Sequence, residues 1–152
     1  MININEIRIL PMSNKDYESK TEYDARKFLS TALIERDGKY YYKSRAINIK
    51  DKYALILFQY NNTIIGYGVL EDIVRNPITE MADNKTIGYN GYLQFLTITI
   101  HNIHNIALQE IQAIDNAITS FSNAKQQIDI KYYYKIYELL LQKQLKYNKS
   151  KV

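Results

Sequence analysis

The chain has 152 residues, of which 20 are Lys or Arg and 16 are Asp or Glu, so its formal net charge is +4. It contains no cysteine, which excludes disulfides and thiolate metal centres. No apolar run approaches the roughly 20 residues that cross a bilayer, and the first residues lack the basic and apolar regions of a secretion signal. We therefore expect one cytoplasmic domain, residues 1–152, that does not enter a membrane.

The first elements along the chain are a short strand, a helix and a second strand. Residues 6–10 are mostly apolar and predict a strand. Ser13 or Asn14 can cap a helix that runs to about Glu35, because apolar residues recur there at helical spacing. These apolar positions are Tyr17, Ala25, Phe28, Leu29, Ala32 and Leu33. A polar and aromatic strand is expected over residues 39–43.

The middle of the chain carries the strongest structural signal, a hairpin. Residues 53–60 and 63–70 both favour strands, and the pair Asn61-Asn62 between them suits a two-residue turn because Asn tolerates positive φ. Gly66 and Gly68 allow the second strand to bend or to approach another backbone closely.

The last part of the chain is expected to contain a loop, a strand and two helices. Residues 74–85 are typical of a loop or an irregular crossing, and residues 92–100 predict a strand. Asn105 can cap a first helix, and a second helix is expected from near Ile130 to about Lys146. The apolar stripe of the second helix consists of Tyr133, Ile136, Tyr137 and Leu140.

This order of elements predicts an α+β fold. A cluster of strands follows one N-terminal helix, and two C-terminal helices follow the strands, which favours a small, curved, mostly antiparallel sheet or barrel. The same order argues against a doubly wound parallel sheet, because strands and helices do not alternate.

Motifs for catalysis or metal binding are weak. His101 and His104 are three residues apart on an expected strand, where such residues point to opposite sides of the sheet, so no metal site is expected. Asp129 and Lys131 have the local D-x-K form of a metal-dependent nuclease, although Asp129 is more simply explained as a helix cap. We expect a protein without enzymatic activity or cofactor, and a nuclease that uses Asp129 and Lys131 stays as an alternative.

Aromatic and basic residues point to binding. Residues 40–45 (YYYKSR) interleave tyrosines with cations, and residues 88–92 (GYNGY) form an aromatic loop. Residues 125–152 contain seven Lys and two acidic residues, so a basic C-terminal segment could contact phosphate. A charged edge strand and a lysine-rich composition would account for both features without a ligand.

Several segments resemble the core of PUA-like domains. They are residues 45–51 (RAINIKD), the strand 55–60, residues 64–69 (IIGYGV), residues 92–95 (YLQF) and residues 121–129 before a closing helix. The similarity spans about residues 43–141. It is strongest to the EVE-like group, which includes modules that precede HNH nuclease domains in modification-dependent restriction enzymes. This chain departs from the pattern because it contains no Trp and no HNH domain.

The resemblance implies nucleic-acid binding, with a flipped base held in a tyrosine-lined pocket and basic residues on the backbone. The partner is then DNA, in modified form if the similarity to restriction modules holds, with a nuclease as partner or fused domain. A small phage or mobile-element protein that inhibits a host defence protein is the alternative, with tyrosines as interface anchors. The expected nucleic-acid-binding residues are Tyr40, Tyr42, Lys43, Ser44, Arg45, Tyr60, Tyr67, Tyr89, Tyr92, Gln94, Lys131 and Lys135.

Overall fold

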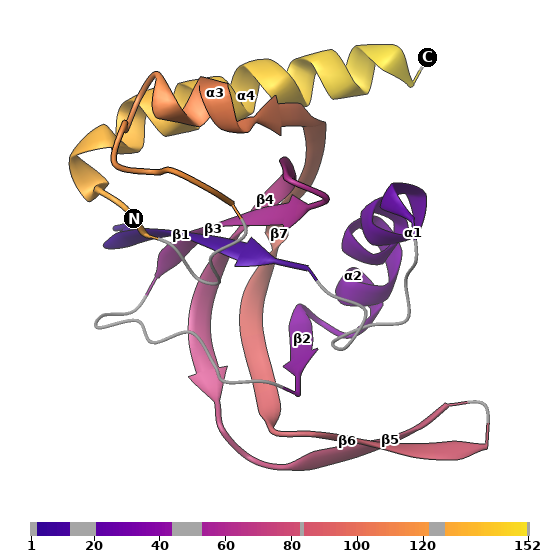
Figure 1. Ribbon diagram of the computed structural model, residues 1–152. Coiled ribbons are helices and arrows are strands. Elements are labelled where there is room, and N and C mark those ends of the chain that lie inside the picture. Colours follow the sequence, from indigo (N-terminus) through magenta and orange to yellow (C-terminus); the bar gives the residue numbers. More distant parts are fainter. Residues whose placement is uncertain (1–2, 13–20, 44–52, 83, 122–126, 152) are drawn as a thin grey trace.

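A computed structural model of the chain describes residues 3–12, 21–43, 53–82, 84–121 and 127–151 (Figure 1). Six strands form the main sheet in the order β2-β7-β4-β3-β1-β8, and two more form a separate hairpin, β5-β6. The main-sheet strands are β1 (Glu6–Pro11), β2 (Lys39–Tyr42), β3 (Ala54–Tyr60), β4 (Thr63–Val74), β7 (Gly91–Ala107) and β8 (Gln127–Ile128). The hairpin strands are β5 (Ile78–Ala82) and β6 (Lys85–Tyr89).

Helices flank the sheet. On the N-terminal side, α1 (Glu22–Lys27), the π-helical η1 (Phe28–Ala32) and α2 (Leu33–Glu35) follow one another without a break. On the C-terminal side lie α3 (Leu108–Gln112), the 3-10 turn η2 (Ile130–Tyr132) and the long α4 (Tyr133–Ser150), which crosses the sheet at its upper end in Figure 1. No helix in the described ranges is long and apolar enough to cross a membrane.

The predicted α+β class and the mostly antiparallel sheet are confirmed. Strands β1 and β3 pair in parallel, and the other pairs of the main sheet are antiparallel. The β3–β4 hairpin forms where it was predicted, with Asn61 and Asn62 at φ of 50° and 64°. Gly66 supplies a close approach, because a Cβ there would lie 2.8 Å from the carbonyl oxygen of His101. A larger residue would push β4 away from β7.

Both faces of the sheet are covered by apolar side chains. The N-terminal helix packs on one face, where Leu29, Phe58 and Phe95 are buried. The C-terminal helices pack on the other face, where Leu57, Ile106 and Leu140 are buried, among others. Alternation along β3 sends successive side chains to the two cores, which is why nearly all of this strand is apolar.

The N-terminal helix starts later than predicted. Thr21 is its N-cap, and its hydroxyl accepts a hydrogen bond from the Asp24 N–H at 3.1 Å. Ser13, Asn14 and Tyr17 lie outside the described residues.

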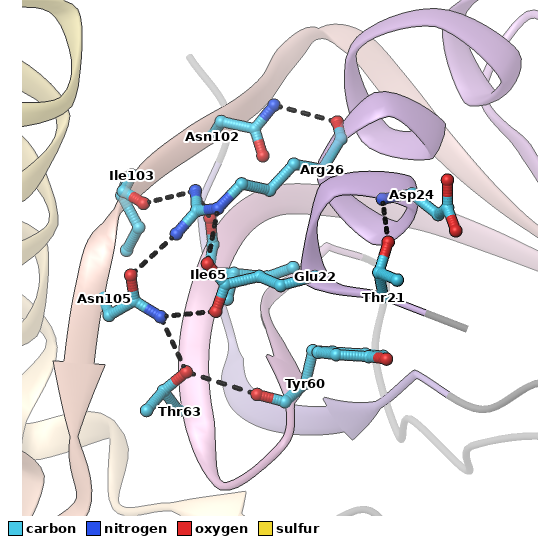
Figure 2. Close-up of polar contacts among 10 residues, drawn as sticks. All are labelled: Thr21, Glu22, Asp24, Arg26, Tyr60, Thr63, Ile65, Asn102, Ile103 and Asn105. Carbon is cyan, nitrogen blue, oxygen red and sulfur yellow. Dashed lines mark hydrogen bonds and ion pairs between the residues drawn. The ribbon is translucent and has the colours of Figure 1, made fainter. Parts of the chain in front are cut away.

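Arg26 ties the N-terminal helix to an irregular part of the sheet (Figure 2). The pairing of β4 with β7 shifts register between Ile64 and Gly66, so the carbonyl groups of Ile65 and Ile103 are available to a side chain. The Arg26 guanidinium donates to these two oxygens at 3.2 and 2.7 Å. Arg26 therefore donates hydrogen bonds to these two carbonyl oxygens in place of the backbone N–H groups that would donate to them in a regular pair of strands.

A polar network surrounds this arginine (Figure 2). Its guanidinium also donates to the Glu22 carboxylate at 3.3 Å and to Asn105 Oδ1 at 2.9 Å. The Asn105 amide donates in turn to Glu22 Oε1 and to Thr63 Oγ1, both at 2.9 Å. The network thus joins α1 to both β4 and β7.

Two predictions about the second half of the chain were wrong. Residues 74–85 were expected to form a loop or an irregular crossing, but β4 runs to Val74, and the strands β5 (Ile78–Ala82) and β6 (Lys85–Tyr89) pair with each other. Asn105 does not cap a helix, because β7 continues to Ala107, where it still pairs with Thr63 of β4. The first C-terminal helix is therefore only the five-residue α3. The second helix is confirmed and extends to Ser150.

Candidate functional site

Strand β2 lies at the edge of the main sheet and alternates between core and surface. Tyr40 and Tyr42 point into the core, whereas Lys39 and Tyr41 are half-buried and Lys43 is exposed on the opposite side. Neighbouring segments hold this edge in place. The side-chain amide of Asn90 donates to the Lys43 carbonyl at 2.5 Å, and the Asn90 N–H donates to the Tyr42 carbonyl at 2.9 Å.

Three tyrosines gather on the side of this edge that faces away from the core of Tyr40; Tyr41 and Tyr92 are half-buried there and Tyr89 is buried. Tyr41 pairs directly with Tyr92 of β7, and their ring centroids are 6.1 Å apart in an edge-to-face arrangement. The ring of Tyr89, from β6, lies 5.2 Å from the ring of Tyr41. The three rings thus come from three different strands.

A cation lies over each of these rings. The Arg36 guanidinium is 5.0 Å from the Tyr41 ring, Lys39 Nζ is 5.4 Å from the Tyr92 ring, and Lys43 Nζ is 5.7 Å from the Tyr89 ring. These distances fall within the range of cation–π attraction. Arg36 also forms an ion pair with Glu80 of β5 at 3.4 Å. We call the group Arg36, Lys39, Tyr41, Lys43, Tyr89 and Tyr92 the edge cluster; it carries three cations.

A second feature is a pocket lined by aromatic side chains beside α4. Tyr67 and His101 form its floor on neighbouring strands, with ring centroids 5.3 Å apart. Tyr133 and Tyr137, one helical turn apart on α4, stack with centroids 5.8 Å apart and an interplanar angle of 8°. The cavity measures about 310 Å³, near the lower limit for small-molecule sites. We call it the tyrosine pocket; Ile4, Leu55, Val69, Ile98 and Thr99 complete its lining.

Burial favours the neutral form of three polar groups in the tyrosine pocket. Burial raises the pKa of Tyr67 to about 12, with smaller contributions from Tyr137 and Tyr133, and its hydroxyl donates to Gln144 Oε1 at 2.5 Å. Burial also raises the pKa of Tyr133 and lowers the pKa of His101. A neutral imidazole offers one donor and one acceptor. The pocket therefore suits an uncharged planar ring better than an ion.

Both features lie on the same face of the sheet. Leu93 and Ile100 of β7 point into the core under the N-terminal helix, so their neighbours Tyr92 and His101 point to the other face. Tyr92 and His101 are nine positions apart in the sequence, which corresponds to at most about 30 Å along the strand. One extended ligand could therefore contact the edge cluster and the tyrosine pocket together.

The structure removes two predicted residues from the surface. Tyr40 is 1% exposed, and its ring packs between Phe28, Phe58 and Phe95. Tyr42 is also buried, with its hydroxyl directed at the Val74 carbonyl. Successive side chains on a strand point to opposite faces of the sheet. Tyr40 and Tyr42 therefore both point into the core, and Tyr41, which lies between them, faces outward.

Other predicted residues hold the structure together or lie elsewhere. Gln94 donates to the Asp37 carbonyl at 2.7 Å and so secures the turn before β2. Tyr60 packs against the core under the N-terminal helix. Lys131 lies on η2 and Lys135 on α4, the helix that carries Tyr133 and Tyr137 of the tyrosine pocket, but neither lysine lines that pocket. Ser44 and Arg45 lie outside the described residues.

Lys43, Tyr67, Tyr89 and Tyr92 do lie at the two features described above. Several of their neighbours were not predicted from the sequence. Arg36 and Lys39 flank the Asp37-Gly38 turn, and the alternation of residues 39–43 was the available signal for Lys39 and Tyr41. Nothing in the local sequence indicated that His101 would join Tyr67, because that contact depends on strand register.

The acidic residues Asp129 and Asp115 both bind backbone N–H groups. Asp129 accepts the Lys131 N–H at 3.0 Å, as expected for a cap. Asp115 is buried nearby, but its oxygens accept the backbone N–H groups of Ala117 and Asp129 at 3.0 and 3.2 Å. Within the part of the chain that the structure describes, no three His, Cys, Asp or Glu side chains are grouped as metal ligands.

No family model matches the sequence, and no curated protein matches it. Among solved structures, the chain is similar to one titled "Crystal structure of ASCH from Zymomonas mobilis". The two share 14% sequence identity with a TM-score of 0.51, over 88% of this chain and 94% of the other. An ASCH domain has a PUA-like fold, and at this identity the likeness shows a shared fold alone, so membership of the PUA-like superfamily stays a prediction. Membership of the EVE-like group also stays a prediction.

Proposed function

We propose that the protein is a nucleic-acid-binding module whose edge cluster contacts the phosphate backbone and whose tyrosine pocket receives a base. The observation that carries this proposal is the edge cluster, in which three exposed or half-buried cations each lie within 6 Å of a tyrosine ring. Lys, Arg and Tyr are among the side chains that bind phosphate oxygens. The PUA-like fold supports the same conclusion, because the families that the sequence resembles bind nucleic acid.

In its finer form, the proposal is recognition of a modified base in duplex DNA, within restriction or defence in the cytoplasm. Flipping a base out of a duplex costs a few kcal/mol, which stacking and edge hydrogen bonds must offset. The rings of Tyr133 and Tyr137 and the neutral imidazole of His101 offer both kinds of contact. Comparing duplexes with and without modified cytosine tests this form, and equal affinities would contradict it.

The experiment for the general proposal is a salt titration. Each phosphate contact on duplex DNA contributes about 0.9 to the slope of log affinity against log salt concentration. Lys39→Ala combined with Lys43→Ala should therefore reduce this slope by about 1.8 and weaken binding. The matched control is Lys149→Ala with Lys151→Ala near the end of α4, which removes the same charge far from β2. Equal effects of the two double variants, or no binding of the unaltered protein, would contradict the proposal.

The proposal assigns no catalytic step to this protein. A labelled duplex incubated with Mg²⁺ tests that assignment, and cleavage would replace the binding module with an enzyme. Cleavage that survives Asp129→Ala would exclude the particular nuclease that uses Asp129 and Lys131.

A second candidate function is inhibition of a defence protein through direct contact. Exposed apolar side chains on α4 favour it: Tyr134 is 83% exposed and Leu145 is 61% exposed. Such side chains are typical of protein interfaces. A stoichiometric protein complex, together with no affinity for nucleic acid, would favour this function over the first.

A further inference from the structure

The β5–β6 hairpin forms an arm that extends from the lower end of the sheet (Figure 1). Its two strands pair with each other and, among the described strands, with no other. Five residue pairs form its ladder, from Ile78 with Tyr89 to Ala82 with Lys85. At about 3.4 Å per residue, the arm is roughly 17 Å long.

One face of the arm is fixed against the edge cluster. Ile78, Glu80, Ile87 and Tyr89 are half-buried or buried on this face. Glu80 forms its ion pair with Arg36, and the Tyr89 ring contacts Tyr41. The arm is thereby positioned beside the proposed phosphate-binding residues.

The other face of the arm is exposed and uncharged. It consists of Thr79, Met81, Thr86 and Gly88, all exposed. Met81 is 69% exposed, and a Cβ added at Gly88 would meet nothing within 4 Å. Among its described residues this face therefore presents two hydroxyl groups and one thioether and no carboxylate, and the Thr86 hydroxyl donates to Met81 Sδ at 3.1 Å.

We propose that this arm enters the major groove of B-form DNA, so that the ligand is duplex DNA and not duplex RNA. This inference rests on the proposed nucleic-acid-binding function. The B-form major groove is about 12 Å wide and about 8.5 Å deep and admits a two-stranded ribbon. The major groove of A-form RNA is too narrow for side chains to read. The Thr hydroxyls can bond to base edges, and Met81 can contact a thymine methyl group.

Continuity with the edge cluster is the reason to place nucleic acid against the arm. Tyr89 belongs to both, so a duplex whose backbone lies on Lys39 and Lys43 has its groove beside β6. The positively charged cluster attracts the polyanion, and the face of the arm that carries Thr79, Met81 and Thr86 reads it at short range.

The test compares matched 12-base-pair duplexes of DNA and RNA, by fluorescence anisotropy, with the full chain and the variant Met81→Glu. The unaltered protein should bind the DNA duplex at least about tenfold more tightly than the RNA duplex, and Met81→Glu should remove most of that preference. The matched control is Tyr23→Glu, which adds the same charge at a 72% exposed position on α1. It should change the affinity for DNA by less than about twofold. Circular dichroism confirms that both variants fold.

Equal affinity of the unaltered protein for the two duplexes, or equal effects of Met81→Glu and Tyr23→Glu, would overturn the inference and leave the proposed function standing. Absence of binding to both duplexes would overturn the two together. Self-association that Met81→Glu abolishes would assign the arm to a second copy of this chain and overturn the groove assignment.

Discussion

Replacing Arg26 with Met should strongly destabilise the protein. The Arg26 side chain is 13% exposed, and its guanidinium donates to two backbone carbonyl groups that the shifted β4–β7 ladder does not satisfy. Each buried acceptor that loses its donor costs about 1–3 kcal/mol, so the two together cost about 2–6 kcal/mol. Met fills a similar volume and recovers part of this loss through apolar burial. We expect a decrease of about 3 kcal/mol in the free energy of unfolding.

Urea denaturation followed by circular dichroism measures this decrease. The matched control is Arg36→Met, because Arg36 is 28% exposed and pairs with a Glu80 side chain that is 36% exposed. An exposed pair of that kind contributes about 1 kcal/mol or less. If Arg26→Met and Arg36→Met destabilise the protein equally, then Arg26 does not replace the missing ladder donors and the reasoning fails.

Two further predictions concern β4 and its neighbours. Gly66→Ala should destabilise the protein by about 1–3 kcal/mol, since its Cβ would lie 2.7 Å from Leu29 Cδ1 and 2.8 Å from the His101 carbonyl oxygen. Gly88→Ala, with open space around it, should change stability by less than about 0.5 kcal/mol in the same assay, and equal losses would contradict the packing account. The Tyr67 pKa is about 12 in the folded state against an ordinary 10.0, so its stabilising contribution is complete below pH 10 and is lost as the pH rises towards 12. Denaturation at pH 9 and pH 11 should show a smaller loss of stability for Tyr67→Phe than for the unaltered protein, and identical losses would refute the burial of this hydroxyl.

Local chemistry explains which elements could be predicted. The β3–β4 hairpin depends on two Asn residues at positive φ and on two apolar strands beside them, all adjacent in sequence. The length of β7 depends on distant partners instead. Ile106 and Ala107 stay extended because they pair with Ile64 and Thr63, and Asn105 is held by Glu22 and Thr63. The prediction that Asn105 caps a helix used only its neighbours in the sequence, so it could not include those distant contacts.

The candidate site was predictable only as a region. Residues 40–45 and 88–92 were identified from their composition, and the structure does bring Lys43, Tyr89 and Tyr92 together. The assignment within the tyrosine run was wrong, because strand alternation buries Tyr40 and Tyr42 and exposes the face of Tyr41. The tyrosine pocket could not be predicted in the same way, because it depends on the register of β4 with β7 and on the packing of α4 against the sheet. Both are set by contacts between residues far apart in the sequence.

The central claim is that nucleic acid lies on the edge cluster. The most direct measurement is photocrosslinking of the protein to a DNA duplex that contains iodinated pyrimidines, followed by mass spectrometry of the linked peptides. We predict crosslinks to Tyr41, Tyr89 or Tyr92, and fewer crosslinks when Lys39 and Lys43 are both replaced with Ala. Crosslinks confined to the α1 surface or to the C-terminal half of α4, with none at these three tyrosines, would contradict the claim.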